Sequence, residues 1–173
     1  MPVGLIQSAW GGTRIEPWTP PAGFAAAETV AHIYREIQLK NPHSALYKTR
    51  LRQLITEVET WLAATRSALQ NEEAVAEMPT YPDALKPPHN QQQPSVLYNA
   101  MIHPIAPFAM RGAIWYQGES NHTEGMLYSE KMKALIGGWR QLWQHGAFPF
   151  YYVQIAPFPY GDEPPSILAE VWE

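Results

Sequence analysis

The sequence contains no cysteine, which excludes disulfides and every metal site that depends on thiolate ligands. Charged residues are scarce at 16%, the net charge is −4 and no basic tract occurs, so nucleic-acid binding is not expected. No apolar run reaches the roughly eighteen residues of a membrane span, so no membrane partner is expected. The first residues also lack the positively charged region of a signal peptide.

Aromatic residues and proline take the place of charge. The chain holds seven Trp, nine Tyr and seventeen Pro among its 173 residues. Aromatic faces pack against sugar rings in some proteins and fill the core in others. The composition therefore leaves open both a sugar-handling protein and a loop-rich enzyme with a tryptophan-rich core. A length of 173 residues is enough for one domain with a sizeable core, and a hydrophobic fraction of 46% is not that of a disordered chain.

Short apolar runs alternate with helical patterns, which is typical of an α/β protein with parallel strands and right-handed crossovers. Buried strands are predicted at 3–6, 113–116 and 150–155. Helices are predicted at 96–103, where Pro104 ends the helix, at 127–144, and from Ser166 onward. Three strands are few for a parallel sheet, so further strands are expected on one or both sides. Functional groups of such sheets collect at the carboxyl ends of the strands.

A helical insert is predicted over about residues 24–95, with helical pattern from 28 to 77. Its clearest helix follows Asn41-Pro42, a suitable cap and first turn. One stripe of this helix is apolar, and comprises Leu51, Leu54, Ile55, Val58, Trp61, Leu62 and Leu69. The stripe predicts a helix that packs on the domain, and it is short for a coiled coil. Residues 79–94, rich in Pro, Asn and Gln, predict a returning loop.

Gly11-Gly12-Thr13 follows the first predicted strand. Its backbone N–H groups could bind an anion or an oxyanion, in which case Arg14, Glu16 and Trp18 would line the pocket. A tight turn with a salt-bridged rim is the alternative interpretation.

Residues 117–121 form a second polar turn after a predicted strand. Gln117 and Asn121 carry N–H donors that can hold an oxyanion, and Glu119 can orient a histidine. The turn could equally serve only to cap the helix that follows it.

No serine or histidine of the chain has a complete catalytic context. Gly118-Glu119-Ser120 lacks the final glycine of a nucleophile elbow, since His122 stands there. Ser8 lies just past a predicted strand, but no activating base is evident. His122 is near the polar turn in sequence, which is not the geometry that a base needs. No histidine has metal-ligand spacing, so neither a metal nor another cofactor is predicted.

Three ordered stretches resemble the sialate O-acetylesterase family. Residues 2–18 resemble its second block, Tyr98–Ile102 with Pro104 resembles a further stretch, and residues 111–121 resemble its third block. The resemblance implies an α/β fold of the SGNH type: a flavodoxin-like, three-layer fold with a parallel sheet, here incomplete and carrying the helical insert. It also implies metal-free removal of acetyl groups from sialic acids, sialoglycans or related acetylated sugars by serine acyl transfer.

The resemblance assigns roles to individual residues. Gly12 or Gly11 would form the oxyanion hole together with Gln117, and Glu119 would support the catalytic histidine. Asn121 would be a further donor. Apart from the resemblance, substrate contacts are predicted for Asn121, Arg14, Trp18 and Trp115, and the stacking candidates of a sugar-binding domain would be Trp18, Trp115 and Tyr116. Core packing is the alternative use of Trp115 and Tyr116.

Two departures from the family pattern concern the chemistry. The family's Gly-Gln-Ser-Asn block with the nucleophile, and its Asp-x-x-His block with the base, do not occur in these residues. We therefore expect an enzyme in the intact protein and an inactive chain by itself, because flanking segments of its own domain are missing. A non-catalytic sugar-binding or interaction domain is one alternative, and an esterase of acetylated xylan or another plant glycan is a second. Full-length family members are expected to be exported, but this sequence does not give its own destination.

Overall fold

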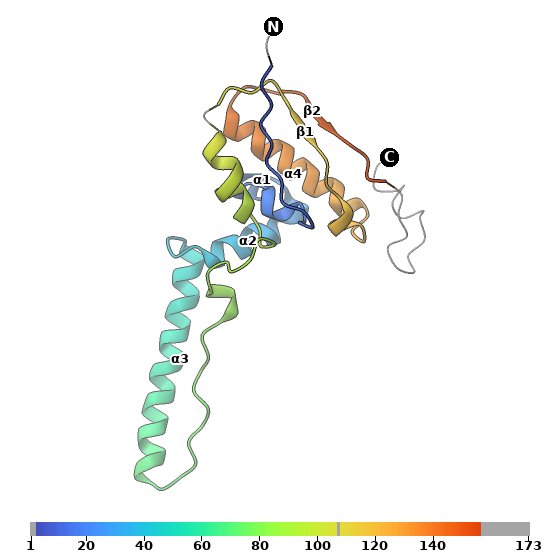
Figure 1. Cartoon of the computed structure of the whole chain (residues 1–173). Coiled ribbons are helices and arrows are strands. Elements are labelled where there is room, and N and C mark those ends of the chain that lie inside the picture. The colour runs from blue at the N-terminus through green and yellow to red at the C-terminus, as the bar shows by residue number, and fades with distance from the viewer. Residues whose placement is uncertain (1–2, 107, 157–173) are drawn as a thin grey trace. The chain divides into compact units, whose positions relative to one another are not determined.

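The computed structural model describes residues 3–106 and 108–156. The chain divides into two compact units, one made of Met1–Tyr34 with His89–Glu173, and the other of Arg35–Pro88. Figure 1 traces the elements of each unit in chain order. The second unit lies inside the predicted insert of residues 24–95, although the bounds of that insert stay a prediction.

The first unit contains a two-stranded parallel sheet. Strands β1 (Ala113–Trp115) and β2 (Phe150–Tyr152) pair in register, and helix α4 (Met126–Trp143) connects them. The expected parallel pairing and the helix predicted at 127–144 are therefore confirmed. The prediction that both strands are buried is wrong. Trp115 is buried while Ile114 is 77% exposed, because the described residues cover only one face of this sheet.

The first predicted strand, at residues 3–6, is not formed. Residues 3–10 have no regular secondary structure, and the side chains of Val3, Leu5 and Ile6 are exposed. An extended apolar segment becomes a strand only when a neighbour pairs with its backbone, and no described strand lies in register with this one. The helix predicted from Ser166 lies outside the described residues.

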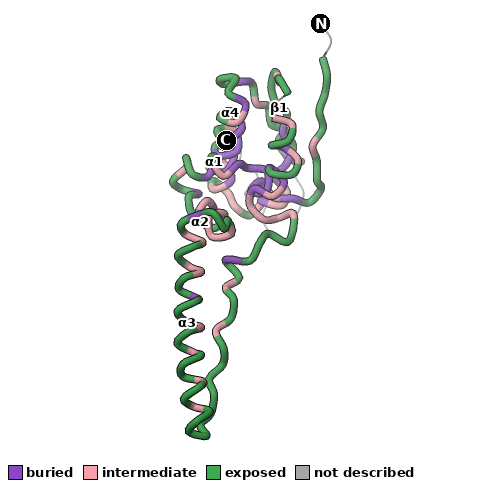
Figure 2. The backbone as a smooth tube through the Cα atoms, turned by 90° about the vertical axis from the view of Figure 1, so that its left-hand side faces the viewer, coloured by how far each residue is buried: buried purple, intermediate pink, exposed green. Residues whose placement is uncertain are grey.

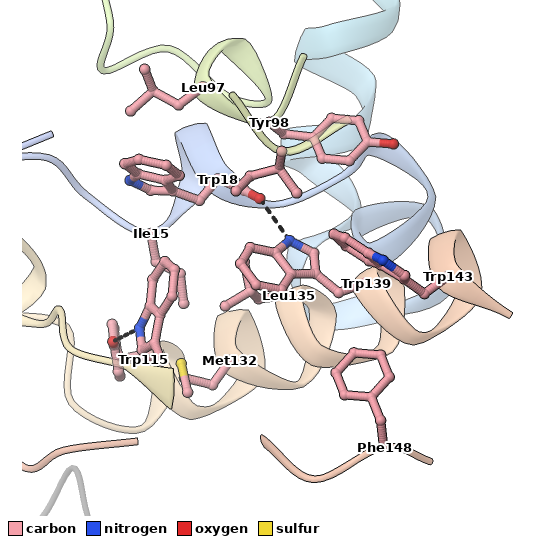
Figure 3. Packing of buried hydrophobic residues seen from close by; sticks show 12 residues of the cluster. Ile15, Trp18, Leu97, Tyr98, Trp115, Met132, Leu135, Trp139, Trp143 and Phe148 are labelled. Carbon is pink, nitrogen blue, oxygen red and sulfur yellow. Dashed lines mark hydrogen bonds between the residues drawn. The ribbon is translucent and has the colours of Figure 1, made fainter. Parts of the chain in front are cut away.

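The core of the first unit is built on one face of α4. Trp139 is the centre of this core: its ring meets the ring of Trp115 edge to face at 5.9 Å, and its indole N–H donates to the carbonyl of Trp18 at 3.1 Å (Figure 3). Twelve buried residues form the cluster: Ile15, Trp18, Leu97, Tyr98, Ile102, Trp115, Tyr128, Met132, Leu135, Trp139, Trp143 and Phe148. The tryptophan-rich core that the composition left open is therefore present.

Helix α1 (Pro21–Ala26) lies directly against α4 because two glycines face each other there. A Cβ on Gly23 would lie 2.1 Å from the carbonyl oxygen of Ala134, and a Cβ on Gly138 would lie 2.6 Å from the ring of Pro20. Such distances leave no room for a side chain at either position. This close approach fixes the segment that precedes α1, which carries the Gly11-Gly12-Thr13 turn.

The short helix predicted at 96–103 exists but is not regular. It includes a π-helix, η4 (Tyr98–Ile102), and continues as a 3-10 helix, η5 (His103–Ile105). The prediction that Pro104 ends the helix is wrong, because Pro104 lies in the first turn of η5, where its missing N–H has no partner to lose.

The second unit consists of part of helix α2 (Ala31–Lys40), helix α3 (Ala45–Gln70) and a return segment, residues 71–88. Ser44, not Asn41-Pro42, caps α3, because its extended backbone lets Oγ accept the N–H of Tyr47 at 3.0 Å. The expected helix beyond residue 70 is absent. The return segment follows α3 and is tied to it where the indole N–H of Trp61 donates to the carbonyl of Ala76 at 2.8 Å.

Most of the apolar stripe predicted on α3 is not buried. Leu54 is the one residue of α3 that is buried, whereas Ile55, Leu62 and Leu69 are exposed. Figure 2 shows the contrast: the tube of α3 is mainly green, while that of α4 carries purple along its length.

Candidate functional site

The two polar turns predicted from the sequence meet at one cavity of about 360 Å³ in the first unit. One wall comes from residues 8–13 with Trp18, and the other comes from β1 and the turn that follows it. The lining residues are Ser8, Ala9, Trp10, Gly11, Gly12, Thr13, Trp18, Ile114, Trp115, Tyr116, Gln117, Glu119 and Ser120. The cavity therefore brings together Gly11, Gly12, Trp18, Trp115, Gln117 and Glu119 of the predicted site residues, whereas Arg14, Glu16 and Asn121 do not line it.

The Gly11-Gly12 turn presents bare backbone to this cavity. Gly12 has a φ of +70°, a backbone conformation in which a residue with a side chain would be strained. Nothing lies within 4 Å of a Cβ placed on Gly11 or Gly12. The backbone N–H groups of Gly11 and Gly12 donate to no other group within residues 3–106 and 108–156. Two adjacent free N–H groups at an open turn can bind a negatively charged oxygen.

Side chains from two directions hold the glycine turn in place. The hydroxyl of Thr13 donates to the carbonyl of Trp10 at 2.7 Å. The side-chain amide of Gln92 donates to the carbonyl of Gly12 at 2.7 Å and accepts the backbone N–H of Arg14 at 3.1 Å. No signal in the sequence pointed to Gln92, which lies in a Gln-rich loop that was predicted only to return the chain.

Gln117 joins the two walls. Its Nε2 group donates to the carbonyl of Thr13 at 3.0 Å and to Oδ1 of Asn121 at 2.9 Å, while its Oε1 accepts the hydroxyl of Tyr128 at 2.9 Å. Burial raises the pKa of Tyr128, so this hydroxyl stays a donor at neutral pH. Both N–H bonds of the Gln117 amide are occupied in this structure. Donation to an oxyanion would require one of these bonds to be exchanged.

Asn121 lies behind the cavity wall and is 1% exposed. Its Oδ1 accepts the backbone N–H of Ile15 at 2.9 Å, and its Nδ2 donates to Glu16 at 3.1 Å and to Glu124 at 3.0 Å. The side chain thereby connects the two turns across 106 positions of sequence. The substrate contact predicted for Asn121 stays a prediction, since its amide serves this network and does not line the cavity.

A buried ion network supports the same turns. Lys131 of α4 is 4% exposed, and its Nζ donates to Glu16 at 2.7 Å and to Glu124 at 2.6 Å. Burial favours the neutral form of Glu16, but the hydrogen bonds from Lys131 and Asn121 outweigh it and hold the pKa of this carboxyl below its ordinary value.

Arg14 completes the network at its outer side. Its guanidinium forms an ion pair with Glu124, and its Nε lies 3.5 Å from Glu16. Arg14 therefore belongs to the salt-bridged rim that was the alternative interpretation of the first turn, and its predicted substrate contact is untested. Lys131 and Glu124 were missed from the sequence. A signal existed for Lys131, which lies at helical spacing between the buried residues Tyr128 and Leu135.

The aromatic residues of the cavity divide into two pairs. Trp18 and Trp115 are buried, with ring centroids 6.3 Å apart in an edge-to-face contact, and they belong to the core. Trp10 and Tyr116 are more than half exposed. The exposed pair offers ring faces to a ligand, and Trp10 was not singled out by the sequence.

Glu119, Ser8 and Ser120 supply the remaining polar groups of the cavity wall. The carboxylate of Glu119 forms no hydrogen bond or ion pair with another described residue, and Ser8 Oγ is buried without a hydrogen-bond partner. His122 is close to the cavity in sequence but does not line it, and its Nδ1 lies 2.7 Å from the carbonyl oxygen of Glu119. The free carboxylate of Glu119 is thus the one acidic group in the wall.

The described part of the chain contains neither a group of metal ligands nor a helix that could span a membrane. Within it, no three His, Asp or Glu side chains are grouped as metal ligands. None of the helices at residues 3–106 and 108–156 is long and apolar enough to cross a membrane.

A cavity between two polar turns, beside parallel strands joined by a helix, fits the class of α/β esterases. Residues 85–171, half of the chain, match the family described as carbohydrate esterase, sialic acid-specific acetylesterase. The chain belongs to this family. The two-stranded sheet is compatible with an incomplete α/β esterase fold, and the flavodoxin-like SGNH arrangement stays a prediction.

Curated relatives agree with the family match. The chain is 30% identical over 169 residues to sialate O-acetylesterase of Rattus norvegicus, covering 91% of this chain and 27% of that protein. The sialate O-acetylesterases of Mus musculus and Homo sapiens are each 29% identical, and 26% and 22% of their lengths are covered. The chain thus spans about a quarter of the length of the curated relatives that it matches.

Proposed function

We propose that this chain supplies part of the active site of an O-acetylesterase that removes acetyl groups from sialic acids or related sugars. The observation that carries the proposal is the cavity with two unpartnered N–H groups, those of Gly11 and Gly12, on one wall and a free carboxylate, that of Glu119, on the other. Ester hydrolysis by a serine requires donors for an oxyanion and an acid to assist a histidine.

The glycine turn is the proposed oxyanion hole. Attack on an acetyl carbonyl places negative charge on its oxygen, and donors that are already in position stabilise this charge without reorganisation. The loss of one such donor typically costs about 3 kcal/mol of transition-state stabilisation. Gly11 and Gly12 carry donors of this kind. In this proposal Gln117 becomes a further donor when it exchanges its bond to Thr13 or Asn121.

Glu119 is the proposed partner of the catalytic histidine. A carboxylate that accepts the histidine's N–H holds the ring in the productive tautomer and stabilises the imidazolium that forms. The nucleophilic serine and the histidine would come from the intact protein, because the family blocks that carry them do not occur in these 173 residues.

Trp10 and Tyr116 are the proposed sugar contacts. Both are exposed at the cavity wall, where a ring face can pack against the apolar face of a pyranose. A sialic acid and an acetylated plant glycan both have such a face, so the contact does not choose between them.

A non-catalytic sugar-binding domain is the second candidate. The observation in its favour is that the exposed aromatic pair and the cavity would suffice for binding. Such a domain would bind an acetylated sugar without releasing acetate.

The deciding experiment compares this chain with a version that is extended at both ends through its flanking coding sequence. We expect the extended protein, but not the chain alone, to hydrolyse p-nitrophenyl acetate and to release acetate from O-acetylated sialic acid. Glu119→Gln should lower kcat of the extended protein about a hundredfold or more, whereas Glu130→Gln, at a half-buried position of α4 that does not line the cavity, should leave it unchanged. Activity of the short chain would contradict the proposal, and binding without hydrolysis by both proteins would favour the second candidate.

A further inference from the structure

The exposed face of α3 has a seven-residue repeat. Ile55, Leu62 and Leu69 are 49%, 39% and 67% exposed, and they follow each other at intervals of seven. This interval places three side chains on one line along a helix, as in a helix that pairs with another helix. The return segment does not cover this line, although it follows α3 and binds Trp61.

A line of charged residues runs beside the apolar line with the same interval. Arg52, Glu59 and Arg66 alternate in sign along α3. All three are exposed. Their side chains form no ion pair within the described residues, whereas the neighbouring Arg50 pairs with Glu57 at 3.2 Å.

We propose that this face of α3 binds a second copy of the same chain, with the two helices antiparallel. In that arrangement Leu62 meets the partner's Leu62 on the twofold axis, and Ile55 meets the partner's Leu69. The same register places Glu59 opposite the partner's Arg66. Every apolar residue then has an apolar neighbour, and Glu59 and Arg66 each face an opposite charge.

The charge pattern selects the orientation and the partner. In a parallel pair the charged line of one helix would lie against the other flank of the apolar line, which carries the uncharged residues Leu51, Val58 and Thr65. In an antiparallel pair the charged line faces its own reversed copy. A pattern that complements itself when reversed is what a twofold interface between identical chains requires.

The contact is small, since it has three apolar layers. We therefore expect an association that depends on concentration, with a dissociation constant on the order of ten micromolar or weaker. The inference rests on the second unit alone and does not depend on the proposed esterase function.

Cysteine cross-linking tests the geometry without interference, because the sequence has no native cysteine. Under mild oxidation, Leu62→Cys should give a covalent dimer of the 173-residue chain. Ile55→Cys alone should not, but Ile55→Cys combined with Leu69→Cys should. Gln53→Cys, exposed on the opposite face of α3, is the matched control. Equal cross-linking at positions 53 and 62, or cross-linking by Ile55→Cys alone, would overturn the proposal.

Charge reversal tests the register by sedimentation equilibrium. Glu59→Arg and Arg66→Glu should each weaken dimerisation on the order of tenfold, because each turns two attractive pairs into repulsive ones. The double variant should restore it. All substituted residues are exposed, and circular dichroism would verify that the helix content is unchanged. A chain that is monomeric at all concentrations, or a double variant that fails to recover, would refute the antiparallel dimer.

Discussion

The cavity wall and the exposed face of α3 use polar and apolar residues in opposite ways. Behind the cavity, Lys131 and Glu16 are buried and fully paired, while on α3 the apolar side chains of Ile55 and Leu62 face outward. A buried charge is tolerated only when its partners are in place, so it fixes the geometry around it. An exposed row of apolar side chains does not contribute to the packing of its own unit, and it can pack against the surface of another molecule. The first unit therefore forms the candidate site, whereas the exposed face of α3 can bind another molecule.

The largest expected effect comes from Lys131→Met. This substitution removes the buried cation between the carboxylates of Glu16 and Glu124 and leaves them only the partly exposed guanidinium of Arg14 at their outer side. It should lower the free energy of unfolding by about 3–5 kcal/mol. Lys133→Met, two residues along α4, removes the ion pair between Lys133 and Glu130 near the surface. This substitution should change the free energy of unfolding by less than about 0.5 kcal/mol. Urea unfolding followed by tryptophan fluorescence measures both. Equal effects would mean that the buried network does not hold the first unit together.

Asn121→Ala should have the next largest effect. It removes the acceptor of the Ile15 and Gln117 N–H groups and one donor from each of two carboxylates, so we expect a loss of about 2–3 kcal/mol. Asn99→Ala, at an exposed position of the same unit, is the control and should be nearly neutral. A small effect at Asn121 in the same urea assay would show that water or a neighbouring group replaces its bonds.

Acid should weaken the first unit through Glu16. The pKa of Glu16 lies below its ordinary value of 4.5, so the stabilisation is present above that pH and is lost as the pH falls through the lower folded value. The contribution of this one group cannot exceed about 1.4 kcal/mol per pH unit. Glu16→Gln should flatten the dependence, seen by urea unfolding at a series of pH values. Asp83→Asn should leave the pH dependence unchanged. The hydrogen bond from Lys86 lowers the pKa of Asp83, but this carboxyl is fully exposed and solvent screens its interactions.

The smallest expected effect is in the second unit. Trp61→Phe removes the indole N–H that binds Ala76, which should loosen the return segment by about 1 kcal/mol. Hydrogen exchange followed by mass spectrometry should show faster exchange in peptides of residues 71–82 and unchanged exchange in α4. Faster exchange in α4 would show that the effect is not confined to the second unit.

The sequence predicted the elements that have strong local signals. The apolar period of α4 and the polar turns at 11–13 and 117–121 could be found because helical spacing and glycine-containing polar turns are local properties. The cap of α3 was misplaced because Asn41-Pro42 and Ser44 are both suitable, and backbone geometry decides between them.

What the sequence could not give depends on contacts between distant residues. The burial of Asn121 and the role of Gln92 are set by partners at a separation of 78 or more positions. Residues 3–6 have the composition of a buried strand, but a strand also needs a neighbour, and composition does not supply one. The exposure of Ile55 and Leu62 was missed because an apolar stripe shows that one face of a helix is hydrophobic, but does not show what covers that face.

The position of the second unit within the chain has a consequence for how the protein can vary. The bond between Ile15 and Asn121 closes a loop of more than a hundred residues, and the whole of the Arg35–Pro88 unit lies inside that loop. The entropy lost on closing a flexible loop grows only with the logarithm of its length, so that a doubling costs about 0.6 kcal/mol. Descendants of this sequence can therefore lengthen, trim or exchange the inserted unit, and with it the surface that α3 presents, while the cavity keeps its shape.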